Sequence, residues 1–380
     1  MIKSANRLNT VQEYYFSKKL REVRALSTQG KPIINMGIGS PDLQPPSKVI
    51  EAIQQAVVTE GAHKYQSYQG LPEFREAVAG FYKNNYNVDL SPDNEILPLM
   101  GSKEGILHIS MAFLNKGDKV LIPNPGYPTY TSVTNLVEAT PVFYELTSEN
   151  NWEPDFEQLA QEDVSNIKMM WVNYPHMPTG AKATQILFEK LIAFGKKHQI
   201  LIINDNPYSF VLNNNPLSIL GVNGAKETAI ELNSLSKSFN MAGWRVGMLL
   251  GAKPILEEVL KVKTQMDSGM FYGIQQGAIA ALKVSSGWFE NMNEIYQKRR
   301  KLIWQIAEAL DCTFDKNTSG MFVWAKIPAG KKAENIVDDL LYKHHIFIAP
   351  GTIFGSKGEG YIRFSLCVPE EKIKEALDRL

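Results

Sequence analysis

The stretch NSLSKSFNMAGWRVG, residues 233–247, places one lysine, Lys237, between serines and a second basic residue, Arg245, among glycines. It lies between two apolar runs, TAIELNS (228–234) and VGMLLG (246–251), which both read as buried strands. A Ser-x-Ser-Lys sequence occurs often by chance, and Lys237 alone would be an unremarkable surface residue. Its role therefore depends on what the rest of the chain brings to it.

The fold class follows from the alternation of apolar runs and helical patterns around this stretch. Helical segments such as 102–115 and 184–199 separate several of the runs. Buried strands that alternate with helices predict an α/β fold, with a mostly parallel sheet covered on both faces. Pro98 lacks a backbone donor, so it predicts an edge or an irregular end for its run. The four further runs are EILPLM (95–100), KVLIP (119–123), IKMMWVNY (167–174) and ILIIND (200–205).

A second, smaller unit is predicted toward the C-terminus. Residues 288–310 space their apolar side chains at helical intervals, as a long amphipathic helix does. Three strand-like segments, of which GYIRFSLCV (360–368) is the last, and a closing helix then predict a small α+β domain. The predicted division is an N-terminal arm with a small-domain segment (1–35), a large cofactor-binding domain (36–285) and a small C-terminal domain (286–380).

Composition narrows the function classes. The 380 residues contain 40 basic and 40 acidic side chains, so the net charge gives no reason to expect nucleic acid or an anionic membrane as a partner. Cys312 and Cys367 are far apart and lack metal-ligand spacing, which predicts neither a disulfide nor a metal site. With no signal-peptide pattern and no long apolar run, we expect a cytoplasmic protein that acts on small molecules.

The segment MGIGSPD (36–42) carries the first half of a dinucleotide-binding fingerprint, Gly37 and Gly39. Asp42 stands at the third glycine position and two prolines follow, so a helix cannot begin there as that motif requires. The remaining interpretations are a tight turn or a loop that contacts substrate.

Two segments place candidate residues where a strand gives way to a helix or a turn. MGSKEG (100–105) begins a helix, whose free N–H groups favour an anion, although Ser102 would also suit a simple N-cap. The proline- and glycine-rich IPNPGYPTY (122–130) presents Tyr127, either for stacking on a planar ring or for packing.

Two charged residues lie in predicted strands. Asp205 ends a buried strand in IINDNPYSF (202–210), where a carboxylate is costly unless it meets a cation; the alternative is a loop-capping aspartate. Arg363 lies in a strand of the small domain, where a solvent-facing arginine is the simpler interpretation.

The candidate residues indicate a function only when the groups that each of them needs are considered together. Lys237 needs a carbonyl partner, Asp205 a cation and Arg363 a carboxylate. Tyr127 needs a planar ring, and the serines and arginine of the opening stretch, with the helix start, offer donors to a phosphate. Pyridoxal 5′-phosphate condensed with an amino acid supplies all five groups.

From the N-terminal arm to the last strand, the chain resembles the class I/II aminotransferases of the fold type I pyridoxal-phosphate enzymes. The order and spacing of the motifs are highly specific. They are NMGIGSPD, KYQSYQGLPEFR, GSKEG, PGYPTY, NYPHMPTGA, NDNPYSF, SLSKSFNMAGWRVG and YIRFSL.

The resemblance implies a role for each matching residue. Lys237 would carry the cofactor as a Schiff base, Asp205 would pair with its ring nitrogen, and Tyr208 would bond its phenolic oxygen. Tyr127 would stack on the ring. Arg363 would clamp the substrate α-carboxylate, with Ile38 and Gly39 nearby. The phosphate would be held by Gly101, Ser102, Lys103, Ser234, Ser236 and Arg245, and by Tyr65 from the other subunit of a homodimer with shared sites.

One position departs from the family pattern. The family usually has asparagine immediately before the Pro-Thr-Gly of NYPHMPTGA, in contact with the phenolic oxygen, and this chain has Met177. Asn173 lies four positions earlier, but it cannot be assumed to replace the missing amide.

The implied activity is transfer of an amino group from an L-amino acid to a 2-oxo acid, with ping-pong kinetics. A carbon–sulfur β-lyase of the same fold is the alternative, and a non-catalytic effector-binding protein is a third interpretation. The latter is a domain of certain transcriptional regulators, but an arm that begins at residue 1 leaves no room for a DNA-binding domain. Residues 266–276 lack the arginine of dicarboxylate-specific relatives, which favours apolar, aromatic or mixed donors.

Overall fold

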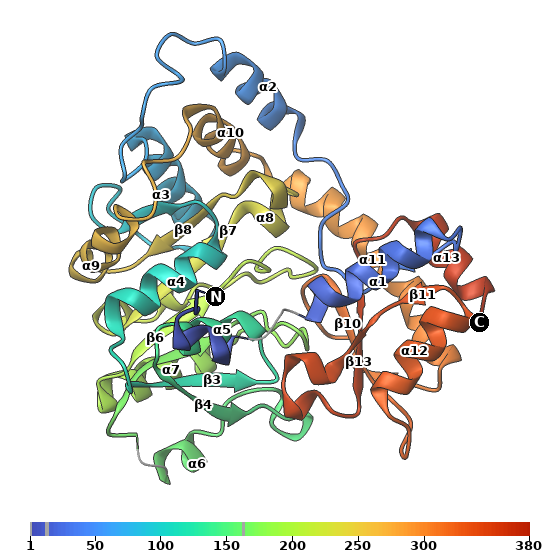
Figure 1. The fold of residues 1–380 in the computed structure, drawn as a ribbon. Helices are drawn as coiled ribbons and strands as arrows, with labels where there is room; N and C mark the ends of the chain where they lie inside the picture. Colours follow the sequence, from blue (N-terminus) through green and yellow to red (C-terminus); the bar gives the residue numbers. More distant parts are fainter. Residues whose placement is uncertain (1, 12–14, 162–163) are drawn as a thin grey trace.

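A seven-stranded sheet forms the centre of the larger unit of the molecule (Figure 1). The computed structural model describes residues 2–11, 15–161 and 164–380. The strand order is β2-β8-β7-β6-β5-β3-β4, and β8 runs antiparallel to both of its neighbours while the other pairs are parallel. The predicted α/β class with a mostly parallel mixed sheet is confirmed. The strands are β2 (Ile96–Leu99), β3 (Lys119–Asn124), β4 (Thr140–Glu145), β5 (Ile167–Val172), β6 (Leu201–Asp205), β7 (Ala229–Ser234) and β8 (Gly247–Leu250).

Each of the six apolar runs singled out in the sequence forms one of these strands. β2 lies at one edge of the sheet, where Pro98 faces Met248 of β8. A proline without a backbone donor is tolerated at such an edge, as predicted. The seventh strand, β4, was missed because it is the opposite edge and its mixed, partly exposed sequence lacks a continuous apolar run.

Both faces of the sheet are buried under helices, as the alternating pattern predicts. Neighbouring strand residues point to opposite sides: Ile203 belongs to one apolar cluster and Ile202 to the other. The flanking elements are α2 (Ser47–Ala56), α3 (Pro72–Tyr86), α4 (Ser102–Phe113), α5 (Pro128–Leu136), α6 (Phe156–Gln161), α7 (Gln185–His198), α8 (Leu235–Ser238), α9 (Lys253–Lys263) and α10 (Tyr272–Leu282).

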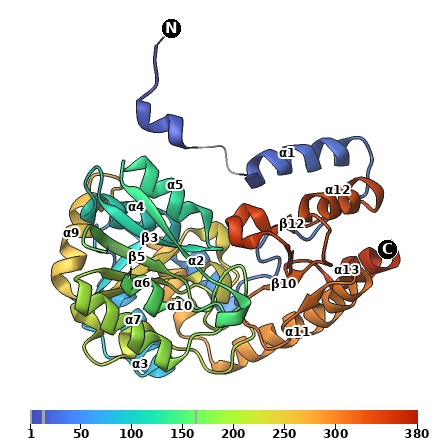
Figure 2. The same cartoon turned by 90° about the horizontal axis from the view of Figure 1, so that it is seen from below.

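The smaller unit lies beside the sheet domain (Figures 1 and 2) and combines the two ends of the chain. In this unit β1 (Ile34–Asn35), from the N-terminal part of the chain, pairs in parallel with β11 (Ile346–Phe347). A four-stranded antiparallel sheet has the order β12-β13-β10-β9. Its other elements are α1 (Tyr15–Thr28), α11 (Ser286–Ala309), β9 (Thr313–Phe314), β10 (Phe322–Lys326), α12 (Ala333–Lys343), β12 (Ala349–Pro350), β13 (Tyr361–Ser365) and α13 (Glu370–Asp378).

The predicted long helix at 288–310 is α11, which leads from the sheet domain into this unit. The predicted domain boundaries stay predictions, although β1 and β11 place the N-terminal segment against the C-terminal one. Among the described helices, none has the length and apolar character that a membrane span requires.

Candidate active site

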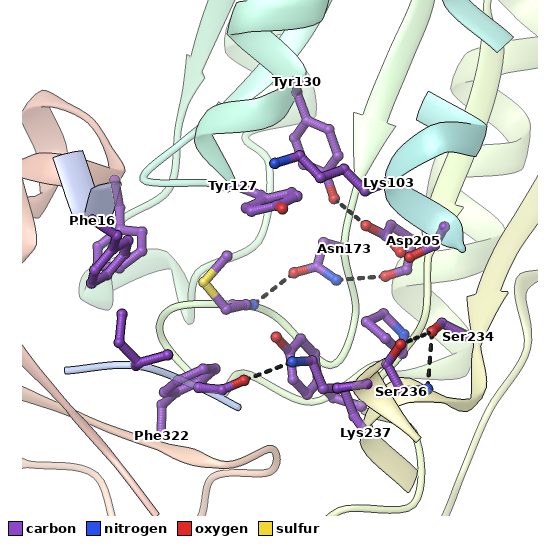
Figure 3. Close-up of a pocket in the computed structure, with 18 of the residues that line it drawn as sticks. Phe16, Lys103, Tyr127, Tyr130, Asn173, Asp205, Ser234, Ser236, Lys237 and Phe322 are labelled. Carbon is purple, nitrogen blue, oxygen red and sulfur yellow. Dashed lines mark hydrogen bonds between the residues drawn. The ribbon is translucent and has the colours of Figure 1, made fainter. Parts of the chain in front are cut away.

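A cavity of about 430 Å³ opens between the sheet domain and the smaller unit. Asp205 ends β6 and Ser234 ends β7, so this part of its wall consists of the carboxyl ends of parallel strands, where ligands of α/β proteins bind. The cavity gathers most of the residues proposed from the sequence (Figure 3). They are Ile38, Gly39, Ser102, Lys103, Tyr127, Asn173, Met177, Asp205, Tyr208, Ser234, Ser236, Lys237, Arg245 and Arg363.

Gly101 lies directly behind this wall rather than on it. It is the N-cap residue of α4, with φ of 111°. A Cβ atom built there would come within 2.0 Å of Arg245 Nη2 and would displace that side chain, and the positive φ would strain any residue other than glycine. Ser102 is the first residue of α4, and the expectation that it serves only as the N-cap is wrong.

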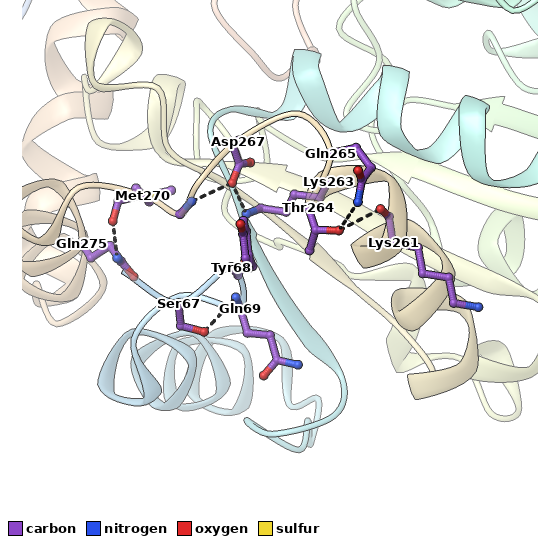
Figure 4. A network of polar contacts seen from close by, with 11 residues as sticks. Ser67, Tyr68, Gln69, Lys261, Lys263, Thr264, Gln265, Asp267, Met270 and Gln275 are labelled. Carbon is purple, nitrogen blue, oxygen red and sulfur yellow. Dashed lines mark hydrogen bonds and ion pairs between the residues drawn. The ribbon is translucent and has the colours of Figure 1, made fainter. Parts of the chain in front are cut away.

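Tyr65 lies outside the cavity of this chain, and its side chain is 90% exposed. A polar network (Figure 4) holds the loop that follows it against the loop after α9. The ammonium of Lys263, which is 2% exposed, donates to the backbone oxygen of Tyr68 at 2.8 Å and to Asp267 at 3.0 Å. The segment that follows the exposed Tyr65 is therefore anchored at Tyr68.

Lys237 lies on α8, immediately after β7, and its Nζ donates to the backbone oxygen of Gly39 at 2.6 Å. Burial lowers the pKa of Lys237; Arg363 and Arg245 act in the same direction, whereas Cys367 opposes them. Gly39 also lies against the ring of Phe322. A Cβ at this position would come within 2.3 Å of that ring, so the close contact requires glycine. The surroundings of Lys237 therefore make its neutral amine easier to form than that of a free lysine.

Asp205 is 5% exposed, and among the described residues only one of its two carboxylate oxygens has a hydrogen-bond partner. The hydroxyl of Tyr130 donates to Oδ2 at 2.8 Å, while Oδ1 is buried and has no hydrogen-bond partner among the described residues. Burial raises the pKa of Asp205 to about 7, against the opposing effect of the Tyr130 bond. A buried carboxylate oxygen without a partner fits a cationic N–H donor from a ligand.

The sequence reasoning missed Tyr130. It lies one turn after Tyr127 on α5, and its ring stacks on Trp171 at 4.8 Å with an interplanar angle of 7°. The spacing Tyr-x-x-Tyr in PGYPTY was a usable signal, since residues three apart share a helix face. The Tyr127 ring meets Tyr130 edge to face at 5.6 Å and forms part of the cavity wall.

A cluster of hydrogen-bond donors, called the donor cluster below, lies in the same cavity as Asp205. It consists of Ser234, Ser236, Arg245 and the first turn of α4. Ser234 caps α8: its Oγ accepts from the Ser236 backbone N–H at 3.0 Å and donates to Ser236 Oγ at 2.8 Å. Arg245 has φ of 58°, a conformation rare outside glycine, and pairs with Glu104 at 3.0 Å. Hydroxyls, an arginine and the first turn of α4 are together suited to a phosphate.

Asn173 and Met177 form one small unit. The Asn173 amide donates to the backbone oxygen of Asp205 at 2.5 Å, and its oxygen accepts from Met177 N at 2.8 Å. The Met177 sulfur lies 3.4 Å from Arg363 Nη1. The thioether therefore faces the arginine, and the Asn173 side chain already bonds the protein at both of its ends.

Arg363 is 4% exposed, so the expectation of a solvent-facing arginine is wrong. Its Nη2 donates to the backbone oxygen of Gly37 at 2.8 Å. The guanidinium carbon lies 3.9 Å from the ring centre of Phe322, 4.5 Å from Phe354 and 5.6 Å from Phe16. These three rings, which also line the cavity, were not found from the sequence because they lie in segments far apart in the chain.

The arrangement fits the cofactor that the sequence predicts. It offers a buried carboxylate oxygen to a ring nitrogen, a donor cluster to a phosphate and a lysine amine to an aldehyde. Tyr208 adds a hydroxyl-bearing ring at the cavity wall, 5.9 Å from the Phe322 ring centre. Within the described ranges, no group of three or more His, Cys, Asp or Glu side chains is placed to hold a metal ion.

The family model and the relatives that match this chain carry descriptions that agree with one another. The family model described as aminotransferase class I and II matches residues 31–380. A protein named LL-diaminopimelate aminotransferase from Halothermothrix orenii is 40% identical, with 100% of this chain and 98% of the relative covered. Its namesake from Aquifex aeolicus is 38% identical, covering 100% and 99%.

Solved structures share the fold over the same length. Substrate-bound BacF from Bacillus subtilis has a TM-score of 0.95 at 34% identity and covers 100% of this chain and 97% of its own. A double mutant of Thermus thermophilus aspartate aminotransferase has a TM-score of 0.92 at 25% identity, with 100% and 99% covered.

Proposed function

Because this chain belongs to the class I and II aminotransferases, which depend on pyridoxal phosphate, we propose that it transfers amino groups between L-amino acids and 2-oxo acids with ping-pong kinetics. The observation that carries the proposal is the position of Lys237. Its amine lies in one cavity with the donor cluster at Ser234, the guanidinium of Arg363 and Oδ1 of Asp205, which has no hydrogen-bond partner in the described part of the chain.

The cofactor, when bound, supplies an aldehyde that condenses with amines and a ring that accepts the electron pair of a broken bond. Lys237 would hold the aldehyde carbon, and Asp205 would keep the ring nitrogen protonated. Tyr127 would cover the ring face, and Tyr208 would donate to the phenolic oxygen. The phosphate would be held by Ser102, Lys103, Ser234, Ser236 and Arg245, with Gly101 allowing Arg245 its close approach.

Lys237 also has a proton to move. Once the amino acid has displaced it, Nζ of Lys237 would take the proton from the substrate Cα and deliver it to the former aldehyde carbon, which the amino nitrogen joins to Cα. The lowered pKa of Lys237 supports this role, because only the neutral amine accepts a proton. The backbone oxygen of Gly39, 2.6 Å from Nζ, would keep the amine at the cavity wall.

Arg363 would receive the substrate α-carboxylate through paired charge-assisted bonds. The three phenyl rings around it exclude water, so the attraction between the two charges is stronger than at a protein surface. Ile38 and Met177 line the same part of the cavity. This half of the site would therefore bind any L-amino acid by its head group.

For the donor, we propose LL-diaminopimelate as the first compound to test. The full-length relatives named for this activity are 37–40% identical to the chain. Apolar and aromatic amino acids form the second group, since the rings of Phe16, Phe322 and Phe354 line the substrate end of the cavity. We also propose a cytoplasmic location, because both cysteines are buried and free.

A donor panel without any oxo-acid acceptor tests the activity. We expect the loaded protein to release one equivalent of 2-oxo acid per site, and to regain its starting spectrum only after an oxo acid is added. The matched control is Lys237→Ala, which should release none. Continuous release of pyruvate and ammonia from cystathionine without an acceptor would instead indicate a β-lyase.

We propose a homodimer with shared sites, in which the exposed Tyr65 completes the partner's phosphate site. Mixing Lys237→Ala and Tyr65→Phe subunits would place both lesions in one site of the hybrid and leave the other intact. We expect hybrid activity above that of either parent, up to about half that of the wild type per dimer. Isolated hybrids no more active than their parents would contradict shared sites.

A further inference from the structure

Glu231, on β7, is a fully buried carboxyl group that the proposed chemistry does not use. Its Oε1 accepts from the Tyr82 hydroxyl at 2.7 Å, and its Oε2 accepts from Asn204 Nδ2 at 3.2 Å and from Ile219 N at 3.1 Å. Burial raises the pKa of this carboxyl, while bonds from Tyr82, Asn204 and Ile219 act in the opposite direction. A buried carboxyl that accepts hydrogen bonds on both oxygens holds the segments that supply the donors in one arrangement.

The network extends from Glu231 in two directions. The Tyr82 hydroxyl accepts from Asn233 Nδ2 at 2.7 Å, and Asn233 Oδ1 accepts from the backbone N–H of Ser234 at 2.7 Å. On the other side, Asn204 Oδ1 accepts from the backbone N–H of Tyr174 at 3.1 Å. The network thus joins α3 to the ends of β5, β6 and β7.

Three members of the network are next in sequence to residues of the cavity. Asn204 precedes Asp205, Asn233 precedes Ser234, and Tyr174 follows Asn173. Asn204 and Glu231 are directly opposite each other in the pairing of β6 with β7. A rotation or shift of either strand end would therefore move Asp205 relative to Ser234.

We propose that Glu231 and Tyr82 are positioning residues that fix the spacing between Asp205 and the donor cluster at Ser234. The proposal rests on the proposed function, in which Asp205 holds the ring nitrogen and Ser234 the phosphate of one rigid cofactor. A ligand bound at both ends requires that spacing, whereas a ligand bound at one end does not. Sites of this kind lose much of their affinity when supporting bonds are removed.

The chain offers a clean pair of variants for the test. Tyr82→Phe removes one hydroxyl and separates Asn233 from Glu231. Tyr144→Phe is the matched control, because Tyr144 is also a buried tyrosine that donates one 2.7 Å bond, to the backbone oxygen of Trp171, outside the network. Glu231→Gln is the second network variant, and Tyr82→Phe carries the test if that protein does not fold.

The measurement compares two ligands on the cofactor-free proteins: pyridoxal phosphate, which spans both ends, and inorganic phosphate, which reaches only one. In Tyr82→Phe we expect the Kd for pyridoxal phosphate to rise about tenfold, the effect of one buried hydrogen bond, and the Kd for phosphate to change less than about twofold. Tyr144→Phe should leave the ratio of the two constants at the wild-type value. Asp205→Asn should weaken pyridoxal phosphate binding less in the Tyr82→Phe background than in the wild type.

Two outcomes would overturn the inference. Equal weakening of both ligands in Tyr82→Phe would indicate general loosening, and a ratio matching that of Tyr144→Phe would show that the network does not act on the site. The proposed function fails separately: in that case the wild type itself would neither bind pyridoxal phosphate nor transaminate.

Discussion

The two halves of the cavity are built in opposite ways. On the cofactor half, Ser234 and Ser236 are hydrogen-bonded to each other, and Asp205 is held by Tyr130. On the substrate half, Arg363 lies among phenyl rings and the sulfur of Met177. Hydrogen bonds between helix residues and the strand-end residues Asp205 and Ser234 give the first half one geometry. Phenyl rings and a thioether surround the single cation of the second half. On the proposed function, this difference means that cofactor geometry and substrate choice would be set by separate parts of the molecule.

The strongest test of the cofactor half is Asp205→Asn. Asparagine keeps the shape of the side chain but removes the charge that would hold the ring nitrogen protonated, so we expect kcat/KM to fall about 100-fold or more, as when a buried charge loses its partner. Affinity for the α-carboxylate, measured with an unreactive substrate analogue, should change little. Equal losses in both quantities would break the distinction between the halves.

The Asp205→Asn variant also tests how the free energy of unfolding depends on pH. Burial raises the pKa of Asp205 from 3.8 to about 7, so the cofactor-free fold prefers the protonated carboxyl. That preference stabilises the fold fully below about pH 4 and is lost as pH rises toward 7, by up to about 4 kcal/mol. Denaturant unfolding of the cofactor-free wild type should show this decline relative to Asp205→Asn. Parallel pH profiles for the two proteins would contradict it.

The substrate half is tested by Arg363→Lys. Lysine keeps the charge but loses the paired bonds and the flat contact with Phe322, so we expect kcat/KM to fall by about 10- to 150-fold. Affinity for pyridoxal phosphate should stay within about twofold, because Arg363 belongs to the other half. A variant that lost amine substrates without a carboxylate and normal amino acids equally would show that Arg363 does not bind the carboxylate.

Met177→Asn is expected to have the smallest effect and to show whether the halves communicate. Asn173 already bonds Asp205 and Met177 within the protein, so of the two positions we expect an amide at 177 to be the one that donates toward the phenolic oxygen. Such a donor should lower the pKa at which the bound cofactor changes its absorption. A spectroscopic pH titration measures this directly, and an unchanged or raised pKa would place residue 177 outside the cofactor half.

The same division explains what the sequence could predict. Residues of the cofactor half follow buried strands in short motifs, so Asp205, Ser234 and Lys237 were found together with the sheet that places them. The edge strand β4 has no continuous apolar run and was missed.

The surroundings of Arg363 could not be predicted, because α1, β10 and β13 are far apart in the chain and meet only through the packing of the smaller unit. The Tyr-x-x-Tyr spacing was a signal for Tyr130, but its bond to Asp205 could be predicted only with knowledge of which way α5 faces. The role of Tyr65 needs a second chain, and it stays a prediction.

The central claim is that Lys237 carries the cofactor in this cavity. Borohydride reduction of the loaded wild type, followed by peptide mapping, tests it most directly. We expect one reduced pyridoxyl group per chain, on the peptide that contains Lys237, and none in Lys237→Ala, which should still bind the cofactor reversibly through the phosphate donors. A stoichiometric adduct on any other lysine would contradict the claim.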